Sequence, residues 1–200
     1  MDVELIVVDD SSTDATAEIA AAAGATIVRV ACRHISAVRN AGARAARGYW
    51  LVFVDADTTI DAHVVRGVLK ALREGAAGGS GVRFDEPVPA YAPVLLAVIE
   101  WWFARLKLAA GCFVFCTRDA FERVGGFSER VFAAEEIFFS RALRREGRVV
   151  ILKEHVTTSG RKVRVYSLRE IVHQMVSVAM KGRKGLRSRS NLDLWYGPRR

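Results

Sequence analysis

The length, composition and charge of the chain exclude several classes of protein. Two hundred residues, 51% hydrophobic and 26% charged, suit one globular domain with a sizeable core and exclude a disordered polypeptide. The formal net charge of +8 favours an anionic partner, such as a nucleotide, a nucleic acid or a membrane surface. Most of this excess is local, because the last twenty residues carry seven Lys and Arg side chains against Asp193 alone.

Short apolar runs alternate with helical patterns in the first half of the chain. Strands are expected at 4–8, 26–30 and 50–54, and helices at 11–24, 36–47 and 61–75. Glycines follow these helices and act as terminators. In the third helix, apolar side chains recur at spacings of three and four, which is typical of one face packed on a core. The alternation predicts an α/β fold with a mainly parallel central sheet and helices on both faces.

The second half continues the alternation after a connection rich in glycine and proline. Strands are expected at 81–84, 112–116 and 148–152, with a Trp-rich helix before the second of them and further helices at 135–146 and 167–181. The most apolar stretch, residues 93–116, contains Glu100, Arg105 and Lys107, whereas a membrane-spanning helix needs about 20 nearly uncharged residues. We therefore interpret it as a soluble helix followed by a strand.

The cysteines and the start of the chain indicate a location. Three cysteines without a C-x-x-C spacing argue against a disulfide framework and against a structural zinc site, and they favour a reducing compartment. The chain opens without a basic-then-apolar leader, so we expect no signal peptide. The expected location is the cytoplasm, with contact at the inner face of the membrane as an additional option.

Carboxylates follow two of the predicted strands at the point where each strand ends. Asp55 and Asp57 follow the strand at 50–54, and in extended chain they point to the same side, where two like charges repel unless a cation lies between them. Asp9 and Asp10 follow the first strand in the same way, and ligands of open parallel sheets bind at the carboxyl ends of strands. Turn formation or helix capping is the alternative reading of each acid.

A third acidic pair, Glu135 and Glu136, opens a predicted helix. Acidic side chains in a first turn are stabilised by the helix dipole, which also keeps them ionised, and an ionised carboxylate beside a substrate hydroxyl is a general base. Adjacent helix positions diverge by roughly 100°, so we expect one of the two to face a cleft and the other to be held by the body of the protein.

Four segments together resemble the family 2 glycosyltransferases, the inverting nucleotide-sugar enzymes of the GT-A fold. They are, in this order, IVVDDSSTDAT, VRNAGARAARGYWLVFVDADT, RDAFERVGGF and AAEEIFFSRALRREGR, and the resemblance covers about residues 4 to 152. The resemblance implies a single GT-A-like α/β domain. It also implies that this domain binds a nucleoside diphosphate sugar and a divalent metal, Mg²⁺ or Mn²⁺, and transfers the sugar to an acceptor hydroxyl with inversion.

The resemblance also implies roles for individual residues. The nucleotide-binding residues would be Asp10 near the base, Asp55 near the ribose or the metal, and Arg39 and Asn40 beside the nucleotide. Pairing of Arg39 with an acidic neighbour is the equal alternative for that residue. Asp57, with Asp55, would hold the metal. Glu136 occupies the position of the catalytic base, where the family more often has Asp, and Glu135 remains the alternative base.

The resemblance divides the chain and shows one departure from the family. It implies a glycosyltransferase-like domain over 1–182, with a nucleotide-binding half at 1–75 and an acceptor-side half at 76–182, followed by a basic tail at 183–200. The strand and helix with which the family usually begins have no counterpart before residue 4. We therefore expect an unprotected sheet edge or an open groove, which raises the chance of a homo-oligomer.

The acceptor is not named by any motif, and a lipid-linked molecule is one candidate. Trp101, Trp102 and Phe103 fit either an apolar acceptor groove or a buried core, and their helical spacing favours the core. The basic tail fits either a solvated end or a peripheral contact with anionic lipid.

Two other functions compete with sugar transfer. A sugar-nucleotide nucleotidyltransferase also holds metal with aspartates on an α/β sheet, but it should carry a glycine-rich phosphate loop near its start, and the sequence has none. A noncatalytic binder of nucleic acid or of anionic membrane would fit the charge. The ordered acidic and glycine motifs favour the transferase, and we expect no nucleic-acid partner.

Overall fold

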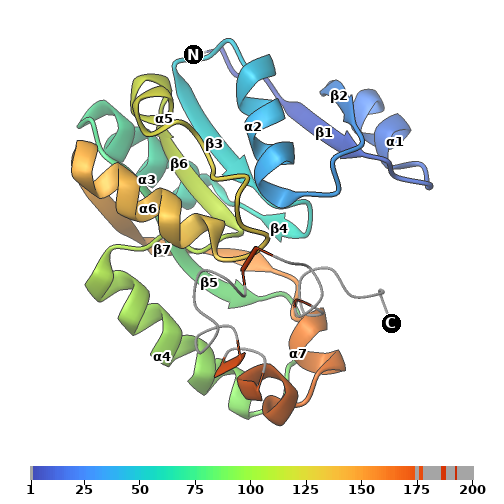
Figure 1. The fold of residues 1–200 in the computed structure, drawn as a ribbon, viewed down its shortest axis with the longest axis vertical. Helices are drawn as coiled ribbons and strands as arrows, with labels where there is room; N and C mark the ends of the chain where they lie inside the picture. Colours follow the sequence, from blue (N-terminus) through green and yellow to red (C-terminus); the bar gives the residue numbers. More distant parts are fainter. Residues whose placement is uncertain (1, 174–175, 178–185, 188–191, 193–200) are drawn as a thin grey trace.

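The structure is a computed structural model that describes residues 2–173, 176–177, 186–187 and 192. Its strands are β1 (Ile6–Asp10), β2 (Thr26–Val30), β3 (Trp50–Val54), β4 (Thr58–Thr59), β5 (Ala77–Phe84), β6 (Phe113–Thr117) and β7 (Val149–Thr158). Its helices are α1 (Thr16–Ala22), α2 (Ile35–Ala45), α3 (Ala62–Arg73), α4 (Tyr91–Leu106), α5 (Arg118–Val124), α6 (Glu135–Glu146) and α7 (Arg161–Val165). Figure 1 shows their arrangement in space.

The strands form two sheets with mixed directions. β1 and β2 pair in parallel, and a separate five-stranded sheet has the order β3-β6-β5-β7-β4. Within the larger sheet only β5 and β7 are parallel. The α/β class is confirmed, but the expectation of mainly parallel pairing is wrong for this sheet. Two strands joined by a crossover helix are parallel. The segment containing α4 is not such a crossover, and β6 is antiparallel to β5.

β1 and β3 each have one unpaired edge. β1 pairs with β2 alone and β3 pairs with β6 alone among the described strands, so the two sheets are not joined by a backbone ladder. A side chain joins them instead, because Oε1 of Glu4 accepts hydrogen bonds from the backbone nitrogens of Arg47 and Gly48, each at 2.6 Å. Val52 and Val54 of β3 remain exposed. These two strand edges therefore have no backbone partner among the described residues.

Helices cover both faces of the larger sheet. On one face, Val114 and Cys116 of β6 pack with the apolar side chains of α5 and α6. On the other face, Phe113 and Phe115 pack with the apolar stripe of α3. This alternation of side chains along β6 places α6 in front of the sheet and α3 behind it in Figure 1.

Two other regions differ from the sequence-based expectation. Trp101 and Trp102 of α4 are 59% and 52% exposed, so their interpretation as core residues is wrong. Most of the basic tail lies outside the described residues, but Leu186 and Leu192 are buried against Val131. None of the helices in the described part of the chain has the length and hydropathy needed to cross a lipid bilayer.

Candidate active site

Arg39 of α2 connects three parts of the chain beyond the carboxyl end of β3. Its Nη1 donates a hydrogen bond to Oε1 of Glu135 at 2.8 Å, and its Nη2 donates to Oδ1 of Asp55 at 2.8 Å. Nη2 also donates to the carbonyl oxygen of Gly111 at 2.6 Å. The guanidinium lies over the ring of Phe127, 5.3 Å from its centroid. The turn after β3 and the start of α6 therefore meet at one side chain.

The electrostatics of this network favour a charged Arg39. Burial lowers the pKa of Arg39, but the charges of Asp55 and Glu135 outweigh burial and raise it above its ordinary value. The side chains of Arg39 and Glu135 are only 9% and 5% exposed. Removing one partner of such a buried pair typically costs about 3–5 kcal/mol, because the other charge is left uncompensated. The network therefore fixes the relative positions of α2, α6 and the turn that carries Asp55.

Asp57 lies two residues beyond Asp55, in the turn that leads into β4. The backbone nitrogen of Thr58 donates to the carbonyl oxygen of Asp55 at 2.9 Å, and that of Ser159 donates to the carbonyl oxygen of Asp57 at 3.1 Å. These bonds hold the turn against the end of β7. The Asp57 residue is exposed, and its carboxylate forms no hydrogen bond or ion pair with any residue that the structure describes. Asp57 therefore presents a free carboxylate where Asp55 does not.

Glu135 and Glu136 have different surroundings although they are adjacent. Glu135 is paired with Arg39, whereas the Glu136 carboxylate makes no ion pair within the described part of the chain. It lies against Gly111, where an added Cβ would be 3.4 Å from Cδ of Glu136. Burial raises the pKa of Glu136 to about 7, and the negative charge of Glu135 adds to the rise. The residue stays partly accessible, so the position suits a general base.

The loop before α6 holds these two carboxylates in place. Ala134 has φ 60° and ψ 20°, in the left-handed region that disfavours residues with a Cβ. The buried side chains of Val131 and Ala133 pack against Leu186 and Leu192. Sequence reasoning missed this support, because no local pattern links the tail to the loop.

Asp10 braces the loop between β2 and α2. Its Oδ1 accepts hydrogen bonds from the backbone nitrogens of Cys32 and Arg33 at 2.7 and 3.0 Å. The neighbouring Asp9 accepts from the backbone nitrogen of Ser12 at 2.9 Å, as a turn former would. Within the described residues Asp10 has no hydrogen bond or ion pair with Arg39, Asp55 or Glu135, so it lies outside the Arg39 network.

Asn40 is occupied by protein partners. Its Nδ2 donates to the carbonyl oxygen of Phe127 at 2.9 Å and to Oε1 of Glu129 at 2.8 Å, and its Oδ1 accepts from the backbone nitrogen of Phe127 at 2.9 Å. Gly126 lies so close that an added Cβ would be 2.8 Å from Oδ1 of Asn40. Asn40 and the loop 124–130 line a cavity of about 510 Å³, which the predicted carboxylates do not line. Asn40 therefore shapes the loop before α6, and its contact with a nucleotide remains a prediction.

Two polar residues at the start of α2 were not predicted. His34 is 9% exposed and Ser36 is fully buried, yet both ring nitrogens of His34 and Oγ of Ser36 lack hydrogen-bond partners among the described residues. The His34 ring packs on Phe132, with centroids 4.5 Å apart. Each unsatisfied buried polar group typically costs about 1–3 kcal/mol, so this position suits a polar ligand. Polar residues at a helix start usually cap the helix, so the sequence alone did not mark these two as candidates for ligand binding.

The turn around Asp57 offers carboxylate oxygens, the ligand type that a hard divalent cation prefers. No group of three or more His, Cys, Asp or Glu side chains lies close enough to hold a metal within the described residues. Mg²⁺ and similar ions need only one or two protein carboxylates when substrate phosphates and water complete their oxygen ligands. Asp57 has the free carboxylate for this role, and Asp55 is already shared with Arg39.

Comparison with a curated protein gives a relative for part of the chain. Succinoglycan biosynthesis protein ExoO from Rhizobium meliloti (strain 1021) is 40% identical over 80 residues, which is 38% of this chain and 22% of that protein. The chain thus spans about a fifth of the length of this relative.

Solved structures share the fold over most of the chain. The mannosyltransferase PcManGT from Pyrobaculum calidifontis, in complex with GDP-Man and Mn²⁺, superposes with a TM-score of 0.63 at 19% identity, covering 90% of this chain and 55% of that one. Glucosyl-3-phosphoglycerate synthase from Mycobacterium tuberculosis, in complex with Mn²⁺ and UDP-Glc, gives 0.57 at 21% identity, covering 92% and 69%. At these identities the likeness shows the GT-A fold.

The family itself is shown by a broader match. The model of glycosyl transferase family 2 matches residues 1–138, which include β1, α2, the Asp55–Asp57 turn and the start of α6. The geometry, the shared fold and this match agree, and the chain belongs to glycosyl transferase family 2.

Proposed function

We propose that this family 2 glycosyltransferase moves a sugar from a nucleoside diphosphate sugar to an acceptor hydroxyl with inversion, and that Glu136 is the general base. The observation that carries the proposal is the Glu136 carboxylate, which has no ion-pair partner among the described residues and whose pKa burial raises to about 7, next to the ion pair of Glu135 with Arg39. A base with a pKa near the working pH is ionised yet able to hold a proton.

Glu136, Glu135 and Arg39 have different roles in this reaction. The acceptor oxygen forms a bond to the anomeric carbon while its proton passes to Glu136. The bond from that carbon to the diphosphate oxygen breaks on the opposite face, and its electron pair leaves with the diphosphate. Glu135 does not take the proton, because it is ion-paired with Arg39 at 2.8 Å. Arg39 positions the base by holding α6 against the Asp55 turn.

Asp57 is the proposed metal ligand, with Asp55 beside it. A Mg²⁺ or Mn²⁺ ion bound here would stabilise the negative charge of the departing diphosphate. The free carboxylate of Asp57 supports this assignment, as do the Mn²⁺ complexes of PcManGT and glucosyl-3-phosphoglycerate synthase.

The nucleotide is proposed to lie between Asp10 and the start of α2. His34 and Ser36 would supply hydrogen-bonding groups that lack protein partners. Arg39 and Asn40, which are satisfied by protein atoms, would act on the nucleotide by shaping its binding surface.

Metal-dependent nucleotide binding tests the proposal. Thermal shifts would be measured with UDP, GDP, CDP and dTDP, with Mn²⁺ and with a chelator. We expect one or two nucleotides to stabilise the protein in Mn²⁺ and to lose that effect on chelation or in Asp57→Ala, whereas the exposed variant Glu122→Gln should respond like the wild type. Binding of nucleic acid that ignores the chelator and falls steeply with salt would point to a noncatalytic binder.

A further inference from the structure

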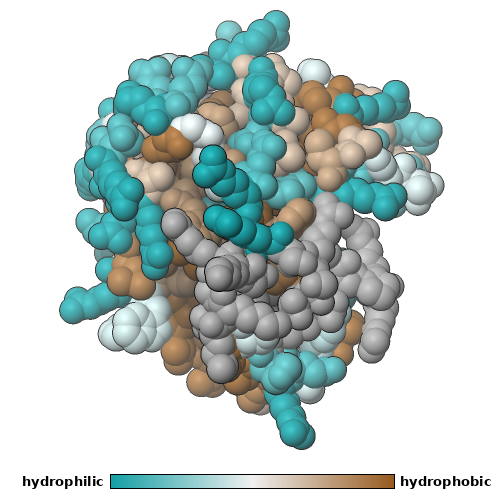
Figure 2. Space-filling view, viewed as in Figure 1, coloured by the Kyte–Doolittle hydropathy of each residue, from teal (hydrophilic) through white to brown (hydrophobic). Residues whose placement is uncertain are grey.

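The outward face of α4 is apolar along almost its whole length. Val94, Val98, Trp101, Trp102 and Leu106 are between 40% and 66% exposed. The two indole rings contact each other at 5.0 Å between centroids, in an edge-to-face arrangement, and so form one exposed aromatic group. Figure 2 shows the apolar side chains gathered over α4 at the lower end of the molecule, with hydrophilic side chains over most of the upper part. Exposed apolar surface of this extent usually marks a docking site.

The polar side chain within α4 points the other way. The carboxylate of Glu100 accepts a hydrogen bond from the backbone nitrogen of Val82 in β5, and Leu96 packs into the core on the same side. Glu100 is the one acidic residue in 91–107. The outward face therefore carries no negative charge from this helix, and Glu100, one of the three charged residues that argue against a spanning helix, does not interrupt the apolar face.

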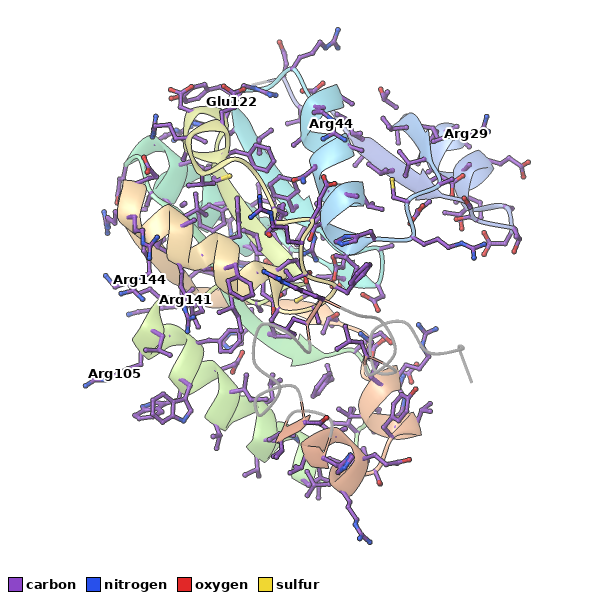
Figure 3. The ribbon with its side chains drawn as sticks, viewed as in Figure 1. Arg29, Arg44, Arg105, Glu122, Arg141 and Arg144 are labelled. Atoms are coloured by element: carbon purple, nitrogen blue, oxygen red, sulfur yellow. The ribbon has the colours of Figure 1, made fainter. Side chains whose placement is uncertain are left out.

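Cations cluster at the carboxyl end of the same helix. Arg105 and Lys107 are exposed, and Nη1 of Arg144 donates to the carbonyl oxygen of Leu106 at 2.6 Å. Figure 3 shows Arg105 of α4 and Arg141 and Arg144 of α6 on the same side of the molecule. The apolar face thus ends in a group of positive charges without an acidic counterpart on α4.

A second apolar stripe begins near the amino end of α4. Leu168, Val172 and Val176, four residues apart, are 39%, 43% and 49% exposed. The Tyr91 hydroxyl group lies 3.1 Å from the carbonyl oxygen of Tyr166 and so ties the start of α4 to the segment that leads into this stripe. The exposed apolar surface is therefore not confined to one helix.

We propose that the outward face of α4 docks on the surface of an anionic phospholipid bilayer. A helix that is apolar on one face, carries Trp on that face and has cations at its border lies in the plane of the membrane interface without crossing it. Tryptophan suits the interface because its ring is apolar and its N–H can reach water. Arg and Lys at the border meet the negative headgroups. A second copy of the chain would cover the apolar face but would bring further cations to it, so the charge favours lipid. The inference does not depend on sugar transfer.

Sedimentation with vesicles tests this surface. The full chain would be mixed with phosphatidylcholine vesicles and with vesicles containing phosphatidylglycerol, at low and high salt. We expect binding to the anionic vesicles alone, weakened by salt because the cations contribute. Trp101→Ser combined with Trp102→Ser should weaken this binding by at least about tenfold, and Arg105→Gln combined with Lys107→Gln should weaken it less.

Matched controls distinguish the α4 face from other causes of vesicle binding. Ile19, which is 69% exposed on α1, provides the control Ile19→Ser, and this variant should bind like the wild type. The Trp101 and Trp102 variants keep the basic tail, so undiminished binding by them would assign the lipid contact to the tail and overturn the proposal. Failure of the wild type to bind anionic vesicles would also overturn it. So would a dimer, measured by light scattering, that the tryptophan variants dissociate in the absence of lipid binding.

Discussion

The two acidic pairs at the site differ in sequence position but share one arrangement. In the turn after β3, Asp55 is bound to Arg39, and at the start of α6, Glu135 is bound to Arg39. Asp57 and Glu136 have no ion-pair partner among the residues that the structure describes. One guanidinium thus holds one member of each pair. Neighbouring carboxylates of the same type therefore differ in chemistry according to whether the buried Arg39 guanidinium reaches them.

The largest effect is expected from the loss of the Glu136 carboxylate. Glu136→Gln keeps the shape of the side chain but removes the base, so we expect transfer to fall by about 10²–10⁴-fold. Binding of the nucleoside diphosphate should stay close to that of the wild type. Turnover with donor and acceptor, alongside calorimetric titration of the nucleotide, would measure both quantities.

A variant of Glu135 tests whether the two adjacent glutamates have different roles. Glu135→Gln removes a buried partner of Arg39, so its main effect should be on stability. If Glu136→Gln retained wild-type turnover, the base would have to be sought at Glu135 or elsewhere.

Removal of the shared cation should break both pairs at once. Arg39→Met leaves the buried carboxylate of Glu135 without a partner, and we expect a loss of about 3–5 kcal/mol in the free energy of unfolding. Arg39→Lys keeps the charge but reaches its acceptors less well, so it should recover part of the loss. Urea unfolding of the three proteins would measure the differences. Equal stability of Arg39→Met and the wild type would show that the network does not hold the site together.

The family and the α/β class could be predicted from the sequence because their signals are local. An apolar run precedes Asp55 and Asp57, and a helix-start pattern includes Glu135 and Glu136. The positions of these acids after β3 and in the first turn of α6 were therefore predicted correctly. The match over residues 1–138 and the likeness to solved GT-A structures confirm the family and the fold. The metal and base assignments remain predictions.

The pairing of the acids could not be predicted, because it depends on contacts between distant segments. Arg39 and Glu135 are 96 residues apart, and nothing in either motif says which acid the arginine reaches. The exposure of Trp101 could not be predicted for the same reason. Its spacing fits a packed helix equally well, and only the placement of α4 against the sheet decides which face is covered.

The pH dependence of stability should separate the free acid from the bound one. The pKa of Glu136 is raised to about 7 in the folded protein, so the folded state favours the neutral form. The resulting stability is complete below the ordinary pKa of glutamate and is lost as pH rises through about 7. Glu136→Gln, which is always neutral, should therefore be more stable than the wild type by about 1–3 kcal/mol at pH 8 and equal to it at pH 4.

Measurement of this difference needs only thermal or urea unfolding at the two pH values. Glu122→Gln, at an exposed position labelled in Figure 3, should show no such difference and serves as the control. A gain for Glu136→Gln that is as large at pH 4 as at pH 8 would show that packing, and not the charge of Glu136, sets the effect.

The smallest effect is expected at Ala134, whose backbone conformation sets the direction of the chain into Glu135 and Glu136. Ala134 holds φ 60° immediately before Glu135, a conformation that glycine adopts without the steric penalty of a Cβ. This relief is partly offset by the greater freedom of glycine in the unfolded chain, so Ala134→Gly should raise stability by about 0.5 kcal/mol. Ala142→Gly, in the interior of α6, should lower it by about 1 kcal/mol. If both glycine variants were destabilised alike, the left-handed turn would not be a source of strain, and packing of the loop 131–134 alone would direct the start of α6.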